Sequence, residues 1–538
     1  MQPRAMPVKR ILPLLVITAL LTGCVGNVSL WGQYQTPTPV GGSVSLYTTT
    51  TPASQVVFVE QTPTALSPQA TSTPTSLIEA FVTLPASSTP EPPTPTFAAD
   101  TILYYAQSGD WLPAVANRFG VSPSEITSPK TLPQDGYIDQ GTLLIIPDRR
   151  DPLTEYTPAL QFIPDSEFVF SATALDFEIE TYIQAANGYL ATYREYLGTT
   201  GWTTSAQGIQ RLATENSVNP RLLLAVLDYE SQWVRGKPAN EFRAKYPLGY
   251  ENYLNTGMFG QLTWAINQMS QGYYGWRNGT LTEVTFTDGK TLRLDPTLNA
   301  GTVAVMILFS KLHTWNEWLR IMDATSGFPA FYQGMFGDPW TRASSITSFF
   351  PPSFSQPPMS LPFETNVTWA FTGGPHSAWG ANGPLAALDF APRNDKSGCY
   401  VSPAWVTAVA PGLVVRSGNG VVVIDFDGDG REQTGWNIMY LHIASKGRVE
   451  VGTWVNLYDK IGHASCEGGV STGTHTHIAR KYNGEWMLAD GPIPFNLSGW
   501  TAEAGTKAYL GRLVRTGQVV TADVNGAAVS LITRTDGE

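Results

Sequence analysis

Two stretches rich in proline stand out in this chain as candidate linkers. Residues 24–98 are dominated by Thr, Pro and Ser, and residues 351–365 are again rich in proline. Segments of the first kind bury too little apolar surface to offset the entropy of ordering them, and proline keeps them extended. We therefore expect 24–98 to be a solvated tether and 351–365 to be a linker between two folded domains.

The N-terminus carries the pattern of an export signal. Three basic residues within the first ten precede an apolar run, Ile11 to Leu21, which is too short to span a bilayer. This pattern predicts a signal peptide over residues 1–23. Its end, Leu21-Thr22-Gly23-Cys24, resembles the lipobox of bacterial lipoproteins. The resemblance implies that Cys24 is acylated, which would anchor the protein on the extracytoplasmic side of the membrane in a bacterial cell envelope. A plain secretory signal with an incidental cysteine is the alternative.

Length, charge and cysteine count set further limits. A chain of 538 residues has room for several domains. Its formal net charge of −11 argues against capture of nucleic acid through phosphate contacts. Besides Cys24 only Cys399 and Cys466 remain. An even remainder in an oxidising compartment predicts one disulfide between them, with buried free thiols as the alternative.

Residues 101–148 show short alternating strand and helix signals. The signals predict a strand near 103–106, a helix over 112–119, a second helix that opens after Ser122, and a closing strand up to Pro147. With its Ser108-Gly109-Asp110 turn and its Leu144 to Pro147 ending, the segment resembles the lysin motif (LysM), a βααβ module. The resemblance implies binding of N-acetylglucosamine in peptidoglycan. A structural remnant without sugar binding is the alternative.

Residues 155–350 are predicted to be mainly α-helical. One helix, Arg221 to Trp233, follows Asn219-Pro220, and proline is favoured in a first helical turn. Its apolar face leads into Glu230-Ser231, an arrangement that resembles the lysozyme-like lytic transglycosylases. The resemblance implies that Glu230 is a general acid/base acting on glycan, and a sugar-binding or spacer role is the alternative. His313 is expected to be a packed or surface residue rather than a ligand.

From Thr368 onward the pattern changes to short strands and glycine-rich turns, which predicts an all-β domain. Five of the six histidines of the chain lie after position 370. Two of them, His475 and His477, are two apart in a strand-like segment, so their side chains should face one pocket. Because neutral imidazole is a preferred ligand of zinc, the pattern predicts a metal site.

Four ordered blocks carry a more specific resemblance. They are Gly373-Gly374-Pro375-His376-Ser377, Leu388-Asp389-Phe390, Tyr440-Leu441-His442 and Gly473-Thr474-His475-Thr476-His477. Together they resemble the lysostaphin-type zinc endopeptidases, and their β-lytic branch in particular. The resemblance implies that His376, Asp389 and His477 hold Zn²⁺. It also implies that His442 and His475 act as general base and oxyanion stabiliser, without deciding which does which.

Two further features of this domain contain residues that can bind metals but lie outside the zinc set. Asp425-Phe426-Asp427-Gly428-Asp429-Gly430 resembles the start of an EF-hand calcium loop, but Trp436 stands where that loop has its glutamate. A tight hairpin is therefore the favoured interpretation, and calcium binding by the three aspartates stays open. His463 lies outside the zinc set and is expected to line a groove or to serve structure.

The sequence thus predicts a multidomain protein of six segments: a lipoprotein signal peptide (1–23), a tether (24–98), a LysM unit (101–148), a mainly α lysozyme-like domain (155–350), a linker (351–365) and an all-β zinc metalloendopeptidase domain (366–538). We expect a lipid-anchored hydrolase that cleaves peptidoglycan peptide cross-links, with peptidoglycan and the membrane as partners. The alternatives are a non-hydrolytic regulator of other wall hydrolases, and a muramidase or lytic transglycosylase that acts through Glu230.

Overall fold

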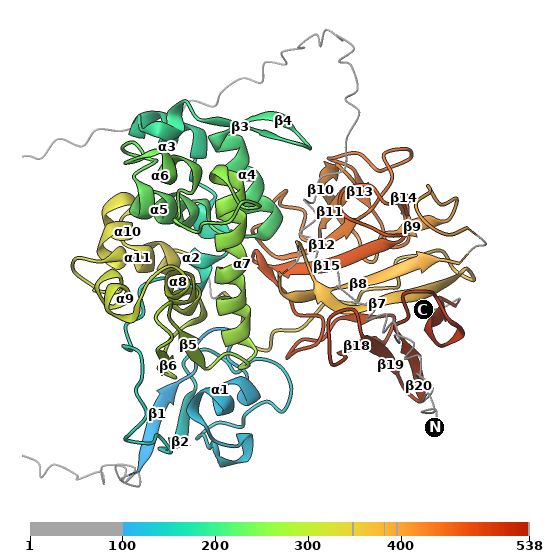
Figure 1. The fold of residues 1–538 in the computed structure, drawn as a ribbon. Coiled ribbons are helices and arrows are strands. Elements are labelled where there is room, and N and C mark those ends of the chain that lie inside the picture. Colours follow the sequence, from blue (N-terminus) through green and yellow to red (C-terminus); the bar gives the residue numbers. More distant parts are fainter. Residues whose placement is uncertain (1–99, 347–348, 381, 394–395, 536–538) are drawn as a thin grey trace, which may run out of the picture. The chain divides into compact units, whose positions relative to one another are not determined.

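The computed structural model of the chain describes residues 100–535 apart from 347–348, 381 and 394–395. The predicted signal peptide, Cys24 and the tether lie outside the described residues. Figure 1 shows the described elements in chain order. Within this range every helix is too short or too polar to cross a membrane.

Residues 101–147 build a small unit around a two-stranded antiparallel sheet. Its elements are β1 (Thr101–Tyr105), α1 (Leu112–Phe119), the 3₁₀ turn η1 (Pro123–Glu125) and β2 (Leu143–Pro147). The prediction of a second α-helix after Ser122 is wrong, since only η1 forms there. The helix cannot continue because Thr127 exchanges two backbone hydrogen bonds with Ile145 of β2, at 3.0 and 2.8 Å, and an extended backbone is needed for that pairing.

The mainly helical character predicted for 155–350 is confirmed. The helices are α2 (Asp165–Phe168), α3 (Ile179–Ala186), α4 (Ser205–Asn216), α5 (Pro220–Ser231), α6 (Glu241–Lys245), α7 (Gly257–Arg277), α8 (Ala300–Ser310), α9 (Trp315–Ile321), α10 (Phe328–Phe336) and α11 (Pro339–Ser344). Between them lie the 3₁₀ turns η2 (Ala172–Ala174) and η3 (Tyr189–Ala191), and two hairpins formed by β3 (Arg194–Leu197) with β4 (Gly201–Thr204) and by β5 (Glu283–Thr285) with β6 (Thr291–Arg293).

Two helices show how the sequence builds this part. α5 begins at the predicted proline because Asn219 Oδ1 accepts a hydrogen bond from the Arg221 amide at 2.9 Å, and this caps the first turn. α8 is buried along its whole length, which is the environment that a helix apolar on every side requires.

The all-β domain predicted after residue 366 is also confirmed. Its large antiparallel sheet runs, in spatial order, through β13 (Trp454–Val455), β10 (Gly412–Gly418), β11 (Val421–Asp425), β12 (Trp436–Leu441), β15 (Thr476–Tyr482), β8 (Leu385–Pro392), β7 (Thr368–Ser377) and β21 (Leu531–Thr533), and β16 (Glu485–Trp486) pairs with β15. A second sheet contains β17 (Asn496–Leu497), β18 (Trp500–Ala504), β19 (Gly511–Arg515) and β20 (Gln518–Thr521). β9 (Trp405–Thr407) pairs with β14 (Lys460–His463), and the 3₁₀ turn η4 (Ala528–Ser530) precedes β21.

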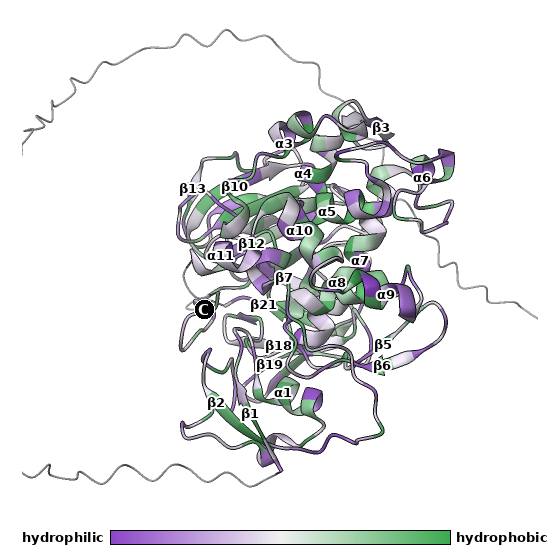
Figure 2. Ribbon diagram, turned by 90° about the vertical axis from the view of Figure 1, so that its left-hand side faces the viewer, coloured by the Kyte–Doolittle hydropathy of each residue, from purple (hydrophilic) through white to green (hydrophobic). Residues whose placement is uncertain are grey.

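The central strands of the large sheet are buried on both faces. Val422 and Ile424 of β11 belong to the core of the β domain, whereas Val421 and Val423 belong to the core that contains the helices. Neighbouring residues of a strand point to opposite faces, so a strand covered on both sides must be almost continuously apolar. Figure 2 shows this hydrophobic colouring along the strands of the β domain. The side chains that carry chemistry therefore extend from a rigid support.

Candidate metal centre

Three adjacent strands of the large sheet bring together residues that are far apart in the sequence. Asp389 of β8 lies directly opposite His477 of β15 on one side and opposite Gly373 of β7 on the other. Irregular register after Gly373 lets β7 carry His376 to the same place. The strands thus assemble a site from three of the four sequence blocks.

The three side chains form a tight triangle of ligand atoms. His376 Nε2 lies 3.2 Å from Asp389 Oδ1, His477 Nδ1 lies 3.2 Å from the same oxygen, and the two nitrogens are 3.0 Å apart. All three residues are buried. Two imidazole nitrogens and one carboxylate oxygen at such spacing are a donor set that suits a tetrahedral zinc ion with one position left open.

In both histidine ligands, the ring nitrogen that faces away from Asp389 is hydrogen-bonded to a backbone carbonyl. This contact fixes the orientation of the nitrogen that faces Asp389. His376 Nδ1 lies 2.8 Å from the carbonyl oxygen of Gly374, and His477 Nε2 lies 3.1 Å from that of Ala378. A carbonyl can only accept, so these nitrogens carry the proton and donate. The nitrogens that face Asp389 then keep their lone pairs for a cation.

The environment of the Asp389 carboxylate also indicates a bound cation. Its Oδ1 is buried and has no hydrogen-bond partner in the part of the chain that the structure describes. Burial raises the pKa of this carboxyl, but the neighbouring His376 and His475 outweigh burial and hold the pKa well below its usual range. The space beside the carboxylate depends on Gly373, because a Cβ atom there would lie 2.7 Å from Asp389 Oδ2. The residues present therefore fit a bound zinc ion.

His442 and His475 lie beside this triangle with their ring centroids 4.5 Å apart. Their Nδ1 atoms lie 2.9 Å from the carbonyl oxygens of Glu467 and Gly473 respectively, so Nδ1 donates and Nε2 is left as an acceptor. His475 Nε2 lies 3.7 Å from Asp389 Oδ1. Burial, reinforced by the nearby His475 and His477 rings, lowers the pKa of His442 to about 3, so this imidazole is neutral at pH 7.

A cavity of about 460 Å³ opens onto these side chains and is bordered by residues 468–475. A disulfide between Cys399 and Cys466 stands at the base of that loop. Next to it, the Tyr400 amide donates to Thr474 Oγ1 at 2.9 Å, which ties the two loops together a second time. The disulfide also adjoins Glu467, whose carbonyl orients His442.

Tyr509, between β18 and β19, is a site residue that sequence reasoning missed. Its ring stacks on His376 with centroids 4.2 Å apart and interplanar angle 22°. It lies in the C-terminal part of the β domain, where the sequence predicted no site residue. A lone tyrosine in a turn gives no periodic or motif signal, so the sequence offered no way to find it.

Two other candidates, His463 and Glu230, lie away from this centre. His463 stacks on Trp405 at 3.8 Å between ring centroids and its Nδ1 lies 3.1 Å from the Ala404 carbonyl, which is a structural role. Glu230 lies in the last turn of α5. Its Oε1 is 2.8 Å from His313 Nε2, and its Oε2 is 3.5 Å from Arg243 Nη1. Glu230 borders neither of the cavities described here.

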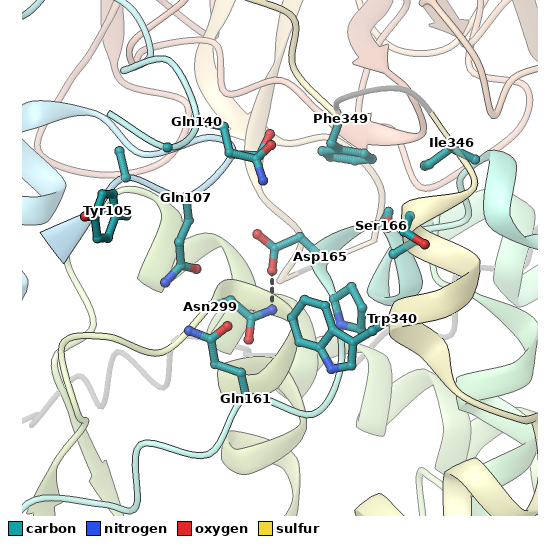
Figure 3. Close-up of a pocket in the computed structure, with 16 residues that line it drawn as sticks. Tyr105, Gln107, Gln140, Gln161, Asp165, Ser166, Asn299, Trp340, Ile346 and Phe349 are labelled. Atoms are coloured by element: carbon teal, nitrogen blue, oxygen red, sulfur yellow. Dashed lines mark hydrogen bonds between the residues drawn. The ribbon is translucent and has the colours of Figure 1, made fainter. Parts of the chain in front are cut away.

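A second cavity, of about 700 Å³, is lined by residues from both the 101–147 unit and the helical part. Figure 3 shows Tyr105 and Trp340 at opposite sides of it, with the side chains of Gln107, Gln140 and Asp165 between them. Asp165 Oδ1 accepts a hydrogen bond from Asn299 Nδ2 at 2.7 Å. Aromatic faces alternate here with amide groups, so the cavity offers both apolar and hydrogen-bonding surface.

Comparison with known proteins adds independent information. Residues 161–349 match a family model described as the N-terminal domain of LasA. Protease LasA of Pseudomonas aeruginosa is 24% identical over 349 residues, which cover 61% of this chain and 75% of that protein. A β-lytic metalloendopeptidase of Achromobacter lyticus is 29% identical over 158 residues, which cover 28% of this chain and 39% of that protein. Among solved structures, the deep-sea M23 metalloprotease pseudoalterin matches at 24% identity and a TM-score of 0.26, covering 32% of this chain and 96% of that one.

Proposed function

We propose that the chain is a metalloendopeptidase of the lysostaphin type and that it hydrolyses the peptide cross-links of peptidoglycan with a zinc ion, as its similarity to protease LasA and to a β-lytic metalloendopeptidase supports. The observation that carries the proposal is the buried triangle of His376 Nε2, Asp389 Oδ1 and His477 Nδ1, with sides of 3.0–3.2 Å. We assign these three residues as the zinc ligands.

The chemistry follows from the donor set and its neighbours. Zinc bound there would supply a Lewis acid and make a water molecule nucleophilic near neutral pH. His442 and His475 both line the same cavity, with their Nδ1 atoms held by backbone carbonyls. One of them takes the proton from the attacking water, and the resulting imidazolium can return it to the leaving amine or stabilise the negative oxygen. The buried His442 imidazole is suited to this exchange because its pKa of about 3 leaves it neutral at pH 7.

Zinc content and product analysis test the proposal together. The purified chain is expected to contain one zinc ion and to release free peptide stems from purified sacculi. A chain that binds no zinc and lyses nothing would instead be a regulator of other wall hydrolases. Release of anhydro-sugars without free stems would show that glycan cleavage is the main reaction.

A second candidate function is glycan cleavage through Glu230, which one feature of the sequence supports. Its carboxylate ends a helix after an apolar face, but both of its oxygens face His313 and Arg243. A glycan would have to displace these partners to reach the carboxylate. Loss of anhydro-sugar products in Glu230→Gln, with stem release intact, would establish the activity.

The N-terminal parts of the chain support attachment to the envelope. We propose that Cys24 is acylated outside the cytoplasm and that residues 24–98 hold the enzyme away from the lipid, which would raise the local concentration of substrate. Metabolic labelling with a fatty acid analogue should mark the wild-type chain and not Cys24→Ala.

We also propose that residues 101–148 act as a LysM-type unit that contacts glycan. The cavity of Figure 3 supports this, because Tyr105 and Trp340 offer aromatic faces that sugar rings stack on, and Gln140 offers an amide for hydroxyl groups. Binding to insoluble peptidoglycan should weaken in Trp340→Ala and stay unchanged in Trp202→Ala, which removes an exposed tryptophan outside the cavity.

A further inference from the structure

The hairpin between β11 and β12 gathers three carboxylates that the proposed hydrolysis does not use. Asp425, Asp427 and Asp429 place one oxygen each within 4.8 Å of the others, with Asp425 buried and the other two exposed. Among the described residues, no Lys, Arg or His forms an ion pair with any of the three. Three acids this close repel one another, and a cation between them would offset that repulsion and the burial of Asp425.

A buried amide oxygen on the facing strand is the second, independent observation. Asn437 is 1% exposed, and its Oδ1 has no hydrogen-bond partner within the described part of the chain. The β11–β12 register places Asn437 directly opposite Asp425. Residues that face each other across two strands project to the same side of the sheet, with Cβ atoms about 5 Å apart. Asn437 Nδ2 donates to the Thr434 carbonyl at 2.8 Å, so the amide is tied to the loop that carries the carboxylates.

This pairing also explains the departure from the EF-hand pattern. In an EF-hand a helix follows the loop and presents a glutamate at the twelfth position. Here a strand follows, and neighbouring strand residues point to opposite faces, so Asn437 and not Trp436 shares the side of Asp425. Trp436 instead stacks on Phe354, with ring centroids 5.2 Å apart.

The backbone of the loop is shaped around the carboxylates. Gly430, at the sixth position, has φ of 85° and its amide donates to Asp425 Oδ2 at 2.9 Å. Gly435 has φ of 57° and lies so close to the Asp427 carboxylate that a side chain there would collide with it. A turn glycine at position six is what a calcium loop of spacing one, three and five requires.

We propose that this hairpin binds one Ca²⁺ through Asp425, Asp427, Asp429 and the Asn437 side-chain oxygen. An all-oxygen set suits calcium rather than zinc, which prefers nitrogen and sulfur. Backbone carbonyls or water complete the six to eight oxygens that calcium takes. The ion would join the loop to β12, the strand that leads into His442.

One electrostatic feature agrees with the proposal. Burial and the neighbouring Asp427 carboxylate raise the pKa of Asp425 to about 6. The hydrogen bond from the Gly430 amide offsets part of this rise. A divalent cation would remove this cost by favouring the charged form.

The test is calorimetric titration of CaCl₂ into zinc-saturated, calcium-depleted protein. The expected result is one site with a dissociation constant on the order of 10⁻⁴ M, in the range of extracellular calcium modules. MgCl₂ should bind at least tenfold more weakly, because Mg²⁺ demands a stricter octahedral geometry. Calcium should also slow cleavage of the 426–435 loop by an added protease.

Variants distinguish specific calcium binding at the hairpin from nonspecific attraction of calcium to acidic side chains. Asp427→Asn combined with Asp429→Asn changes only exposed side chains, and Asn437→Ala removes the buried oxygen; each should weaken calcium binding at least tenfold. Glu450→Gln, an exposed acid elsewhere in the same domain, should leave it unchanged. The proposal is overturned if CaCl₂ gives no heat in the wild type, or if the double variant binds as tightly as Glu450→Gln. Neither readout depends on peptide hydrolysis.

Discussion

His477 Nδ1 lies 3.2 Å from Asp389 Oδ1 because the two residues face each other across the β15–β8 register. Their separation is thus set by the backbone ladder and not by a loop. If one strand slipped by one residue against the other, the two side chains would lie on opposite faces of the sheet. The metal centre is therefore as well defined as the sheet that carries it.

Removal of the shared carboxylate should empty the centre. We expect Asp389→Ala to lower zinc affinity by more than about 100-fold, beyond what loss of an outer hydrogen-bonding partner costs. Zinc per chain, measured by elemental analysis after gel filtration, checks this. His463→Ala, a histidine outside the triangle, serves as control and should keep its zinc. Full zinc content in Asp389→Ala would mean that the ion is held elsewhere.

The close approach of β7 to the carboxylate gives a subtler prediction. In Gly373→Ala the new methyl group would stand 2.7 Å from Asp389 Oδ2, so the carboxylate must move and zinc affinity should fall at least tenfold. The matched control is Gly418→Ala in β10, where no atom lies within 4 Å of the added Cβ. Equal zinc affinities in the two variants would show that the carboxylate can shift without cost.

The two flanking histidines should affect rate and not metal content. We expect His475→Ala and His442→Ala each to lower kcat by about 10²–10⁴-fold, the usual contribution of a proton-transfer group, while one zinc per chain remains. Comparison of stem release with elemental analysis separates the two effects. Retained hydrolysis in purified His475→Ala would rule out its role as base.

Reduction should destabilise the loops around the cavity. The Cys399–Cys466 bond closes a segment of 67 residues, for which loop-closure entropy corresponds to about 4 kcal/mol. We expect dithiothreitol to lower the unfolding temperature of the wild type and to leave that of Cys399→Ser/Cys466→Ser unchanged. An identical response of both proteins would argue that the bond contributes nothing.

Stability should rise with pH in the alkaline range because of Lys481. Burial, partly offset by Glu432, lowers the pKa of its ammonium from 10.5 to about 8. Below pH 8 both folded and unfolded chains hold the proton, and the folded chain bears the full cost of burying the charge. Between pH 8 and 10.5 the unfolded chain binds more protons, so this group makes folding more favourable as pH rises.

The difference should amount to on the order of 3 kcal/mol across that window. Denaturant unfolding at pH 8 and pH 10 measures it, and Lys481→Met should lack this component of the rise. Lys446→Met, which removes an exposed lysine, should behave like the wild type. A Lys481→Met protein with the wild-type pH dependence would contradict the assignment.

Sequence reasoning was most informative where residue type and spacing express one local rule. The all-β part followed from short strands and glycine-rich turns, and Pro220 marked the start of α5. The blocks around His376, Asp389 and His477 identified the residues that the structure brings together. In each case the deciding information lies within a few neighbouring positions.

What the sequence could not supply comes from contacts between distant segments. η1 stops after one turn because Thr127 pairs with Ile145, which no local propensity encodes. Tyr509 reaches His376 only through the return of the chain after β18. The partner of Asp425 was missed because the EF-hand template looks for position twelve, whereas strand register selects Asn437.

The backbone of His442 has φ of 66°, the left-handed region that costs a residue with a Cβ atom of order 1 kcal/mol and that glycine or asparagine enters more readily. Glycine or asparagine at this position would therefore make the fold more stable, so any imidazole held here is kept at a local cost in folding free energy.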